Sequence, residues 1–399
     1  MKYDFDKIID RINTNCEKYD SLKRAYPLSD ENTIPLWVAD MDFPCSDAII
    51  ESIKERLLNP VLGYTFVYAD DEYKSAVCDW MRDKHDFIID KKDIYYSGGI
   101  VPAMCVLINS LTNEGDNIIV NQPVYTPFMN IVKDNNRNLV NSPLVKDENG
   151  DYTLDFEDFE KKIKDNNVKM FLFCSPHNPI GKVWTKDELL KIGEICKKYN
   201  VIVFSDEIHC DIVRKGIKHI PIASLFENDD IFITGTAPSK TFNIPGMKVS
   251  NIIIKNEEYK NKWKLYTQKR LHTADPNVFV PGLVKAAYKE SDDWYNYMLE
   301  YVEENFKYIK RFVNENLENV GFEIPQATFL GWLDMNKYDI DYSKLSDLFV
   351  TKGGFAIQHG KQFGEEGVGY FRINVATSRK NIEKAMNGMK EVLKDIPVK

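Results

Sequence analysis

Three apolar segments of the sequence each lead into a polar side chain, and this repeated pattern limits the possible folds most strongly. The three segments are residues 169–174, 201–204 and 231–234. Asn178, Asp206 and Lys240 follow them, in this order. Short runs rich in β-branched and aromatic residues predict strands that are buried on both faces of a parallel sheet. Open α/β sheets bind their ligands beyond the carboxyl ends of such strands, so we expect the three side chains to share one site.

Segments with helical character alternate with these strands. Helices are expected from Ser46, as the N-cap residue, to about residue 58, over residues 70–84, 100–111, 156–164 and 186–199, and from residue 344. Further strands are expected over residues 94–97, 117–120 and 249–254. Alternation of strands and helices predicts a mainly parallel sheet with helices on both faces. The chain has 399 residues, of which 43% are hydrophobic, and a chain of this length is expected to form two domains.

Lys240 lies in a loop, residues 235–246, that follows the third apolar segment. A lysine held in such a place loses its charge easily, because burial and neighbouring positive charges both lower the pKa of an ammonium group. The neutral amine can then act as a nucleophile or a base. Ser-Lys-Thr alone also fits an ordinary surface turn, but the two other strand ends favour a functional lysine.

A pair of glycines separates the strand at residues 94–97 from the helix that follows it. Glycines at the start of a helix let backbone N–H groups approach a phosphate, and the helix dipole favours the negative charge. Gly98-Gly99 alone is weak evidence. Together with Lys240 it predicts a phosphate site, to which Gly99 and Ile100 contribute backbone amides. The Gly-x-Gly-x-x-Gly pattern of dinucleotide enzymes is absent after the first strand.

The composition excludes several classes of protein. The formal net charge of −9 argues against nucleic-acid binding, which requires a basic surface. No segment approaches the roughly 18 consecutive apolar residues of a membrane span, and the first residues lack the apolar core of a signal peptide, so we expect a cytoplasmic protein. The seven cysteines form no Cys-x-x-Cys pair, which predicts mostly buried free thiols and no metal site.

Two groups of residues resemble a known family. Asn178-Pro179-Ile180-Gly181, Asp206 and Ser239-Lys240 resemble, in order and spacing, the fold-type I pyridoxal-phosphate enzymes of the class I/II aminotransferases. Residues 32–44, Asn-Thr-Ile-Pro-Leu-Trp-Val-Ala-Asp-Met-Asp-Phe-Pro, resemble the MalY/PatB branch of this family, the cystathionine β-lyases. The resemblance implies an α/β fold. Its large domain, residues 45–285, would hold a mainly parallel sheet of the seven-stranded type between helices. Residues 1–44 and 286–399 would form a smaller α/β domain.

The resemblance also implies pyridoxal 5′-phosphate as the cofactor and assigns roles to individual residues. Lys240 would carry the cofactor and remove the Cα proton of an amino-acid substrate. Asp206 would pair with the ring nitrogen of the cofactor, and Asn178 would bind its O3′ atom. Tyr125 would stack on the ring. Arg372 would hold the substrate α-carboxylate, because a guanidinium group forms two parallel hydrogen bonds to a carboxylate.

The sequence departs from the family pattern at three positions. His209 stands where many members have a tyrosine that binds O3′, and an imidazole can donate a similar hydrogen bond. Lys248 stands where aminotransferases often have a phosphate-binding arginine. Ala237 stands where a phosphate-binding serine is frequent, and Thr236 or Ser239 would supply the hydroxyl instead.

Tyr64 has a role only if the protein is a homodimer, since in the family a Gly-Tyr at this place reaches the phosphate of the other subunit.

Several of the residues named above also fit purely structural roles. Tyr64, Tyr125 and Trp332 fit aromatic packing, His209 fits a satisfied core histidine, and Arg372 fits an ion pair within an apolar strand. Trp37 and Val38 fit the core and Asp40 and Asp42 fit turns, and for Asp42 we favour the turn.

We therefore expect a carbon–sulfur β-lyase that cleaves cystathionine or a related cysteine S-conjugate to a thiol, pyruvate and ammonia. The same residues would also serve an aminotransferase. A third hypothesis is a regulatory protein that binds the cofactor but turns over slowly. Only residues 32–44, with the segments around Asp206 and Lys240, favour the lyase.

Overall fold

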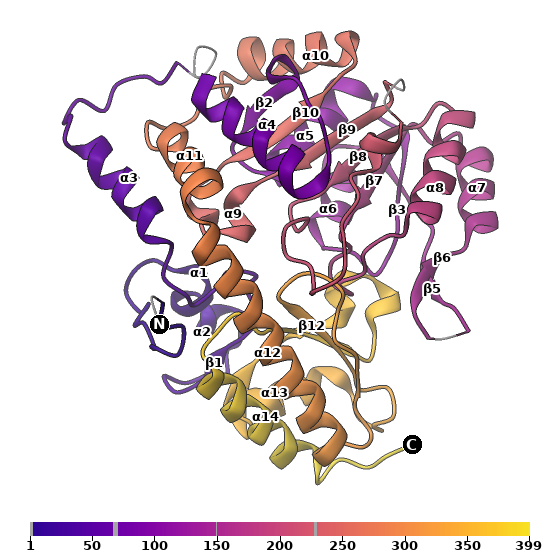
Figure 1. Cartoon of the computed structure of the whole chain (residues 1–399). Coiled ribbons are helices and arrows are strands. Elements are labelled where there is room, and N and C mark those ends of the chain that lie inside the picture. Colours follow the sequence, from indigo (N-terminus) through magenta and orange to yellow (C-terminus); the bar gives the residue numbers. More distant parts are fainter. Residues whose placement is uncertain (1–2, 67–70, 149, 227–229) are drawn as a thin grey trace.

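A seven-stranded sheet forms the centre of the molecule (Figure 1). The computed structural model describes residues 3–66, 71–148, 150–226 and 230–399. From one edge of the sheet to the other, the strands are β2 (Ile94–Ser97), β10 (Ser250–Ile254), β9 (Phe232–Thr236), β8 (Ile202–Asp206), β7 (Met170–Cys174), β3 (Asn117–Val120) and β4 (Asn138–Asn141). The six strands expected from the sequence are all present, and the prediction of an α/β fold is confirmed.

The sheet is mainly parallel, as predicted. Neighbours from β9 to β4 pair in parallel, whereas β10 runs antiparallel to both β9 and β2. In the register of the central strands, Cys174 lies beside Asp206 and Asp206 lies beside Gly235. The three strand ends singled out in the sequence therefore meet at the same edge of the sheet.

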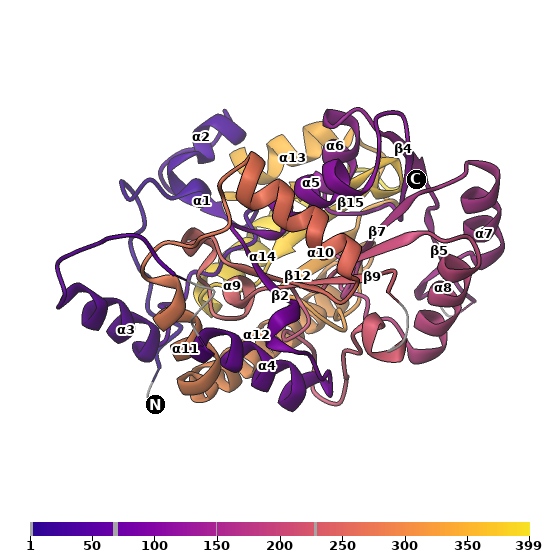
Figure 2. The ribbon, with the colours of Figure 1, turned by 90° about the horizontal axis from the view of Figure 1, so that it is seen from above.

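Helices cover both faces of the sheet (Figure 2). Successive side chains of a strand point to opposite faces, so Phe171 and Phe173 join one apolar core while Met170 and Leu172 join the other. The first core also contains residues of α4 (Asp71–His85), α7 (Phe156–Asp165), α8 (Lys186–Lys198) and α11 (Val280–Glu290). The second contains residues of α5 (Ile100–Leu111), α6 (Pro127–Asp134) and α10 (Glu257–Lys264). Burial on both faces explains why the strands are almost continuously apolar.

The C-terminal part forms a second, smaller layer below the large sheet in Figure 1. Its antiparallel strands, in spatial order, are β11 (Gly321–Phe322), β12 (Leu330–Asp334), β15 (Tyr370–Asn374) and β14 (Gln358–His359). Its helices are α12 (Asp292–Asn316), α13 (Tyr342–Thr351) and α14 (Arg379–Leu393). Near the N-terminus, β1 (Ile34–Pro35) pairs with β13 (Phe355–Ala356), which ties the first residues to this part. The domain boundaries at residues 45 and 285 stay a prediction.

Local signals fix the helix ends. The hydroxyl of Ser46 caps α3 (Asp47–Leu57), as expected, and Thr185 and Glu188 form a reciprocal capping box at the start of α8. The predicted helix over residues 70–84 is α4, and residue 70 itself lies outside the described residues. The remaining elements are α1 (Glu17–Asp20), α2 (Leu22–Ala25), β5 (Leu144–Lys146), β6 (Tyr152–Leu154) and α9 (Pro238–Thr241).

No helix in the described ranges combines the length and the apolar character that a membrane crossing requires. All seven cysteines are free, as predicted, but only Cys174, Cys196 and Cys210 are buried. The other four are half-buried.

Candidate active site

A cavity of about 200 Å³ lies at the carboxyl ends of β7, β8 and β9. Nine of the residues singled out in the sequence line it: Gly99, Ile100, Tyr125, Asn178, Asp206, His209, Ser239, Lys240 and Lys248. They come from six separate stretches of the chain. The structure thus places nearly the whole predicted set around one space of ligand size.

Lys240 is half-buried in helix α9, and its amine points to the N-terminal segment of the chain. Its Nζ donates a hydrogen bond of 2.6 Å to the carbonyl oxygen of Ala39. Burial lowers the pKa of Lys240 to about 8, and the positive charge of Arg372 acts in the same direction, while Asp40 and Asp206 oppose it. This is the partly neutral lysine that nucleophilic or basic chemistry needs.

Asp206 ends strand β8 and is only 5% exposed. Its Oδ1 accepts a hydrogen bond of 3.1 Å from the backbone N–H of Ile208. Burial raises the pKa of this carboxyl to about 7, against the opposing effects of that hydrogen bond and of Lys240. One hydrogen bond offsets little of the cost of burying this carboxyl. The carboxyl therefore suits a ligand that brings a protonated nitrogen into the cavity.

The phosphate site predicted at the start of α5 has the required backbone. Gly99 is the N-cap residue with φ of 142°, a conformation that favours glycine, and no side chain caps the helix. The first amides of α5 are therefore free to bind an anion. Ser239 and Lys248 line the same cavity and add a hydroxyl and a positive charge. The Thr236 hydroxyl is buried without a partner in the described residues, and Thr236 does not line the cavity.

His209 and Tyr125 provide two rings at the cavity. Burial lowers the pKa of His209 well below its usual value, and the charges of Lys240 and Arg372 lower it further, so the imidazole is neutral. Its Nδ1 is buried and has no hydrogen-bond partner within the described ranges. The histidine is therefore not a satisfied core residue. Tyr125 is half-buried, and its backbone N–H donates to the carbonyl of Asn178, which fixes the two residues relative to each other.

Arg372 on β15 lies next to the cavity without lining it. Its Nη1 donates to Asn178 Oδ1 at 2.9 Å, and its Nη2 donates to the carbonyl of Trp37 and to Gln358 Oε1. The guanidinium stacks on the ring of Phe363 at 4.8 Å, and Nε has no partner in the part of the chain described. These acceptors are neutral, so the structural ion pair considered above is not found among the described residues. A buried arginine paired only with neutral groups suits an anionic ligand.

Sequence reasoning missed the part played by residues 37–42. The carbonyl oxygen of Ala39 accepts a hydrogen bond from Lys240 Nζ, and Ala39 lines the cavity. Asn374 Nδ2 donates to the carbonyls of Val38 and Asp40, and Asn243 Nδ2 donates to that of Met41. Backbone carbonyls leave no trace in the sequence, so only the unusual length of the resemblance around residue 39 could have drawn attention to this segment.

Buried ion pairs hold the same segment in place. Arg11 bridges Asp40 at 2.5 Å and Asp42 at 2.7 Å, and Lys18, which is fully buried, lies 2.9 Å from Asp42. Asp42 does lie in a bend, as we favoured, but the ion pairs are its main contacts. The turn interpretation was therefore incomplete, because the partners stand more than twenty residues away in the sequence.

Two aromatic residues lie outside the cavity. Tyr64 is fully exposed on the segment that follows α3, so its predicted role at a partner's phosphate stays a prediction. Trp332 is buried on β12 and stacks on Tyr370. It lines a different cavity of about 410 Å³, whose walls contain none of the predicted site residues. The packing interpretation of Trp332 is confirmed.

The lowered pKa of Lys240 predicts how its reactivity depends on pH. Only the neutral amine reacts, so the acetylation rate of Lys240 in the cofactor-free protein should rise up to pH of about 8 and then level off. Competitive labelling with acetic anhydride, read by mass spectrometry of the Lys240 peptide, measures this rate. The internal standard is Nα-acetyl-lysine amide, whose rate should keep rising to a pH near ~10.4. A Lys240 rate that follows the standard would contradict the assigned burial.

Comparisons with known proteins agree with this arrangement. The family model of aminotransferase class I and II matches residues 31–389 of the chain. The chain is 37% identical to cystathionine beta-lyase PatB of Bacillus subtilis, over 98% of this chain and 99% of that protein. A PLP-bound putative aminotransferase of Clostridium difficile is 40% identical, with a TM-score of 0.94 over 98% of this chain and all of that one. A PLP-bound C-S lyase of Staphylococcus hominis is 36% identical, with a TM-score of 0.92 over 98% of both chains. The chain belongs to the aminotransferase class I and II family.

Proposed function

We propose that this protein is a pyridoxal-phosphate-dependent carbon–sulfur β-lyase, which cleaves L-cystathionine or related cysteine S-conjugates. The observation that carries the proposal is the meeting of Lys240, Asp206 and Asn178 in one cavity beside the start of α5. A lysine with a pKa of about 8 and a buried carboxyl are the two groups that this cofactor requires of a protein.

The residues present fit the cofactor at both of its ends. The amides of Gly99 and Ile100, with Ser239 and Lys248, would hold the phosphate, because a helix start with a nearby hydroxyl and cation suits an anion. At the other end, Asp206 would hold the protonated ring nitrogen. Between the two ends, His209 Nδ1 and Asn178 would bind O3′ and Tyr125 would cover the ring. The orphaned Nδ1 of His209 supports this assignment.

Bound pyridoxal phosphate draws electrons from the substrate Cα and so makes its proton acidic. The protein residues supply the remaining steps. Arg372 would orient the substrate by its α-carboxylate. Lys240 would take the Cα proton, which its lowered pKa permits. The sulfur at Cβ then leaves with its electron pair and takes up a proton. Addition of water to the remaining three-carbon fragment gives pyruvate and ammonia beside the thiol, so the reaction is balanced by one water molecule.

The choice of a lyase rests on the likeness to PatB and to the C-S lyase of Staphylococcus hominis. An aminotransferase is the second candidate, since the similar Clostridium difficile structure is described as a putative aminotransferase. The two reactions share Lys240, Asp206 and Arg372, and they differ in what happens after the Cα proton has left. An aminotransferase needs a keto acid to complete its cycle, whereas a β-lyase does not.

A homodimer in the cytoplasm is the proposed state of the protein. Around Tyr64, several large apolar side chains are exposed: Leu57, Leu58, Val61, Leu62 and Phe66. Several exposed apolar side chains on one segment are typical of an interface between subunits. In a homodimer, Tyr64 would reach the phosphate bound by the partner, which is the role implied by the family resemblance.

Product analysis tests the proposed reaction. Cofactor-loaded protein is incubated with L-cystathionine and no keto acid, and pyruvate and free thiol are measured over many turnovers. We expect sustained release of both in equal amounts. Without pyruvate, a change of the bound cofactor to its pyridoxamine absorbance that a keto acid reverses would identify an aminotransferase instead. A protein with bound chromophore and neither reaction would fit the regulatory hypothesis.

A further inference from the structure

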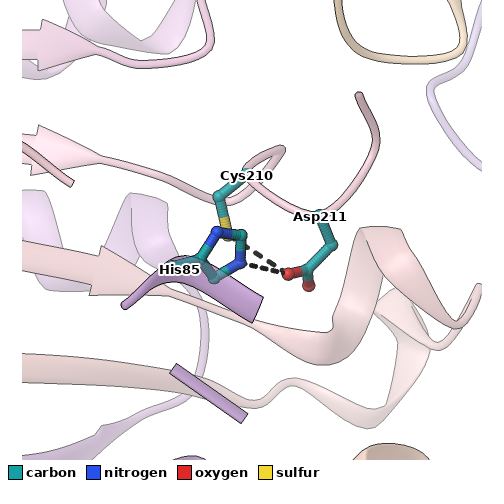
Figure 3. Close-up of side chains that lie close together, drawn as sticks. All are labelled: His85, Cys210 and Asp211. Atoms are coloured by element: carbon teal, nitrogen blue, oxygen red, sulfur yellow. Dashed lines mark hydrogen bonds and ion pairs between the residues drawn. The ribbon is translucent and has the colours of Figure 1, made fainter. Parts of the chain in front are cut away.

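A buried polar cluster binds Thr241, the residue that follows Lys240, and lies outside the cavity. Its centre is Asp211, which follows β8 and is 3% exposed. Figure 3 shows the side chains of His85 and Cys210 beside the Asp211 carboxylate. None of these three residues lines the cavity. None of them takes part in the proposed reaction.

Both carboxylate oxygens of Asp211 are hydrogen-bonded. Oδ1 accepts from Trp80 Nε1 at 2.9 Å. It also accepts from His85 Nε2 at 2.7 Å (Figure 3). Oδ2 accepts from the hydroxyl of Thr241 at 2.7 Å. Burial raises the pKa of Asp211, but hydrogen bonds from His85, Thr241 and Trp80 outweigh it, so the pKa lies below its usual value and the group is ionised. An ionised carboxylate only accepts, which makes His85 Nε2 the donor.

Both carboxylate oxygens of Asp211 are hydrogen-bonded without a metal ion. The side chains of His85, Cys210 and Asp211 could each offer one ligand atom, and these atoms lie within 4.8 Å of one another. The carboxylate oxygens of Asp211, however, already accept from Trp80, His85 and Thr241. The geometry is that of a hydrogen-bonded anchor.

Thr241 connects this anchor to the cavity. It directly follows Lys240 in helix α9, and consecutive helical residues project about 100° apart, so the two side chains point in different directions. Thr241 is fully buried against Asp211, while Lys240 faces the cavity. Asn243 fixes the following turn from another side, through the carbonyls of Met41 and Phe43.

We propose that the buried Asp211 carboxylate, held by His85 and Trp80 of α4, positions Lys240 by binding the hydroxyl of Thr241. This inference rests on the proposed function of Lys240 as the residue that carries the cofactor. Asp211 and Thr241 are positioning residues, since neither lines the cavity. The anchor joins the short helix α9 to the fifteen-residue helix α4, so the lysine is held by a rigid element and not by its loop alone.

A second buried pair continues the cluster toward Asp206. Glu207 follows Asp206 in the chain and accepts from the hydroxyl of Ser205 at 2.8 Å, while its other oxygen lies 2.9 Å from His219 Nε2. The rings of His219 and His85 meet edge to face at 5.5 Å. The polar cluster therefore includes residues that are next to Lys240 and to Asp206 in the chain.

Thr241 provides the sharpest test, because two substitutions of similar size separate the hydroxyl from packing. Thr241→Val removes the hydroxyl and keeps the shape, while Thr241→Ser keeps the hydroxyl. The readout is the rate at which the apoprotein gains the visible absorbance of lysine-bound cofactor after pyridoxal phosphate is added. We expect Thr241→Val to be slower by about tenfold or more, since small displacements of a reacting group are costly. Thr241→Ser should restore most of the rate.

Asp211→Asn gives a second, spectroscopic readout. The pH midpoint of the bound-cofactor absorbance should fall by about half a unit to one unit, because the buried carboxylate that binds the residue next to Lys240 loses its negative charge. Thr112→Val is the matched control. It also removes a buried, hydrogen-bonded hydroxyl, but at the far end of α5 from Gly99. It should leave both the attachment rate and the midpoint unchanged, even where it lowers the melting temperature.

The possible outcomes separate the two proposals. Folded Thr241→Val protein with a wild-type attachment rate, or folded Asp211→Asn protein with an unchanged midpoint, would overturn the positioning proposal alone. If Asp211→Asn does not fold, the Thr241 pair decides the question. Wild-type protein that never gains the visible absorbance would overturn the proposed function, and the positioning proposal with it.

Discussion

Replacement of Lys240 by alanine should lower the rate of cystathionine cleavage by at least about a thousandfold, because the proposed proton acceptor at Cα is lost. The variant should also lose the visible absorbance of lysine-bound cofactor. Among the described residues, Lys248 is the other lysine that lines the cavity, and it is assigned to the phosphate. Both effects have the same cause, and both are measured on one sample by steady-state kinetics and an absorbance spectrum.

The fold should survive this change. Lys240 makes one hydrogen bond, to Ala39, and alanine favours the helical conformation of α9. Circular dichroism and the melting temperature of the apoprotein check this. Lys215→Ala, which removes an exposed lysine far along the loop after β8, serves as the control and should keep full activity. Retained cleavage by Lys240→Ala would remove this lysine from the mechanism.

Asp206→Asn should lower the cleavage rate by about a hundredfold or more, the usual cost of losing one preorganised electrostatic partner at a reacting centre. Asparagine has the size of aspartate and can still accept from the N–H of Ile208. It cannot carry the negative charge that would keep the ring nitrogen protonated. The expected loss is therefore in kcat, while the affinity for cofactor falls less.

The measurement is a comparison of kcat and of the cofactor dissociation constant between wild type and Asp206→Asn. Asp187→Asn makes the same chemical change in the exposed first turn of α8 and should behave as wild type. An Asp206→Asn enzyme with unchanged kcat would mean that the buried carboxyl does not face the ring nitrogen. The raised pKa of Asp206 would then need another explanation.

The central strands and the site residues at their ends could be predicted because both leave clear local signals. A strand buried on both faces is a continuous apolar run, and Cys174, Asp206 and Thr236 lie at or near the ends of three such runs. The helix start at Ser46 was visible as a capping residue, whereas the capping box of Thr185 and Glu188 was not predicted. The antiparallel direction of β10 was not predicted, since an apolar run carries no direction.

The hydrogen bonds that hold the site residues in place could not be predicted, because each joins residues far apart in the chain. Asp211 binds His85 across 126 positions, and Asn374 binds the carbonyl of Val38 across 336. The role of Ala39 depends on its backbone oxygen, to which the side chain contributes nothing. The pairing of Arg372 with neutral acceptors, which distinguishes a ligand-binding arginine from a structural one, likewise appears only in three dimensions.

We expect Lys240 to carry the cofactor in the cavity at the strand ends. Reduction of the cofactor-loaded protein with borohydride fixes the cofactor permanently to its lysine, and digestion followed by mass spectrometry identifies the modified peptide. We expect one pyridoxyl-phosphate group per chain, attached to Lys240. Attachment at Lys248 or at another lysine, or no stable attachment at all, would contradict this assignment.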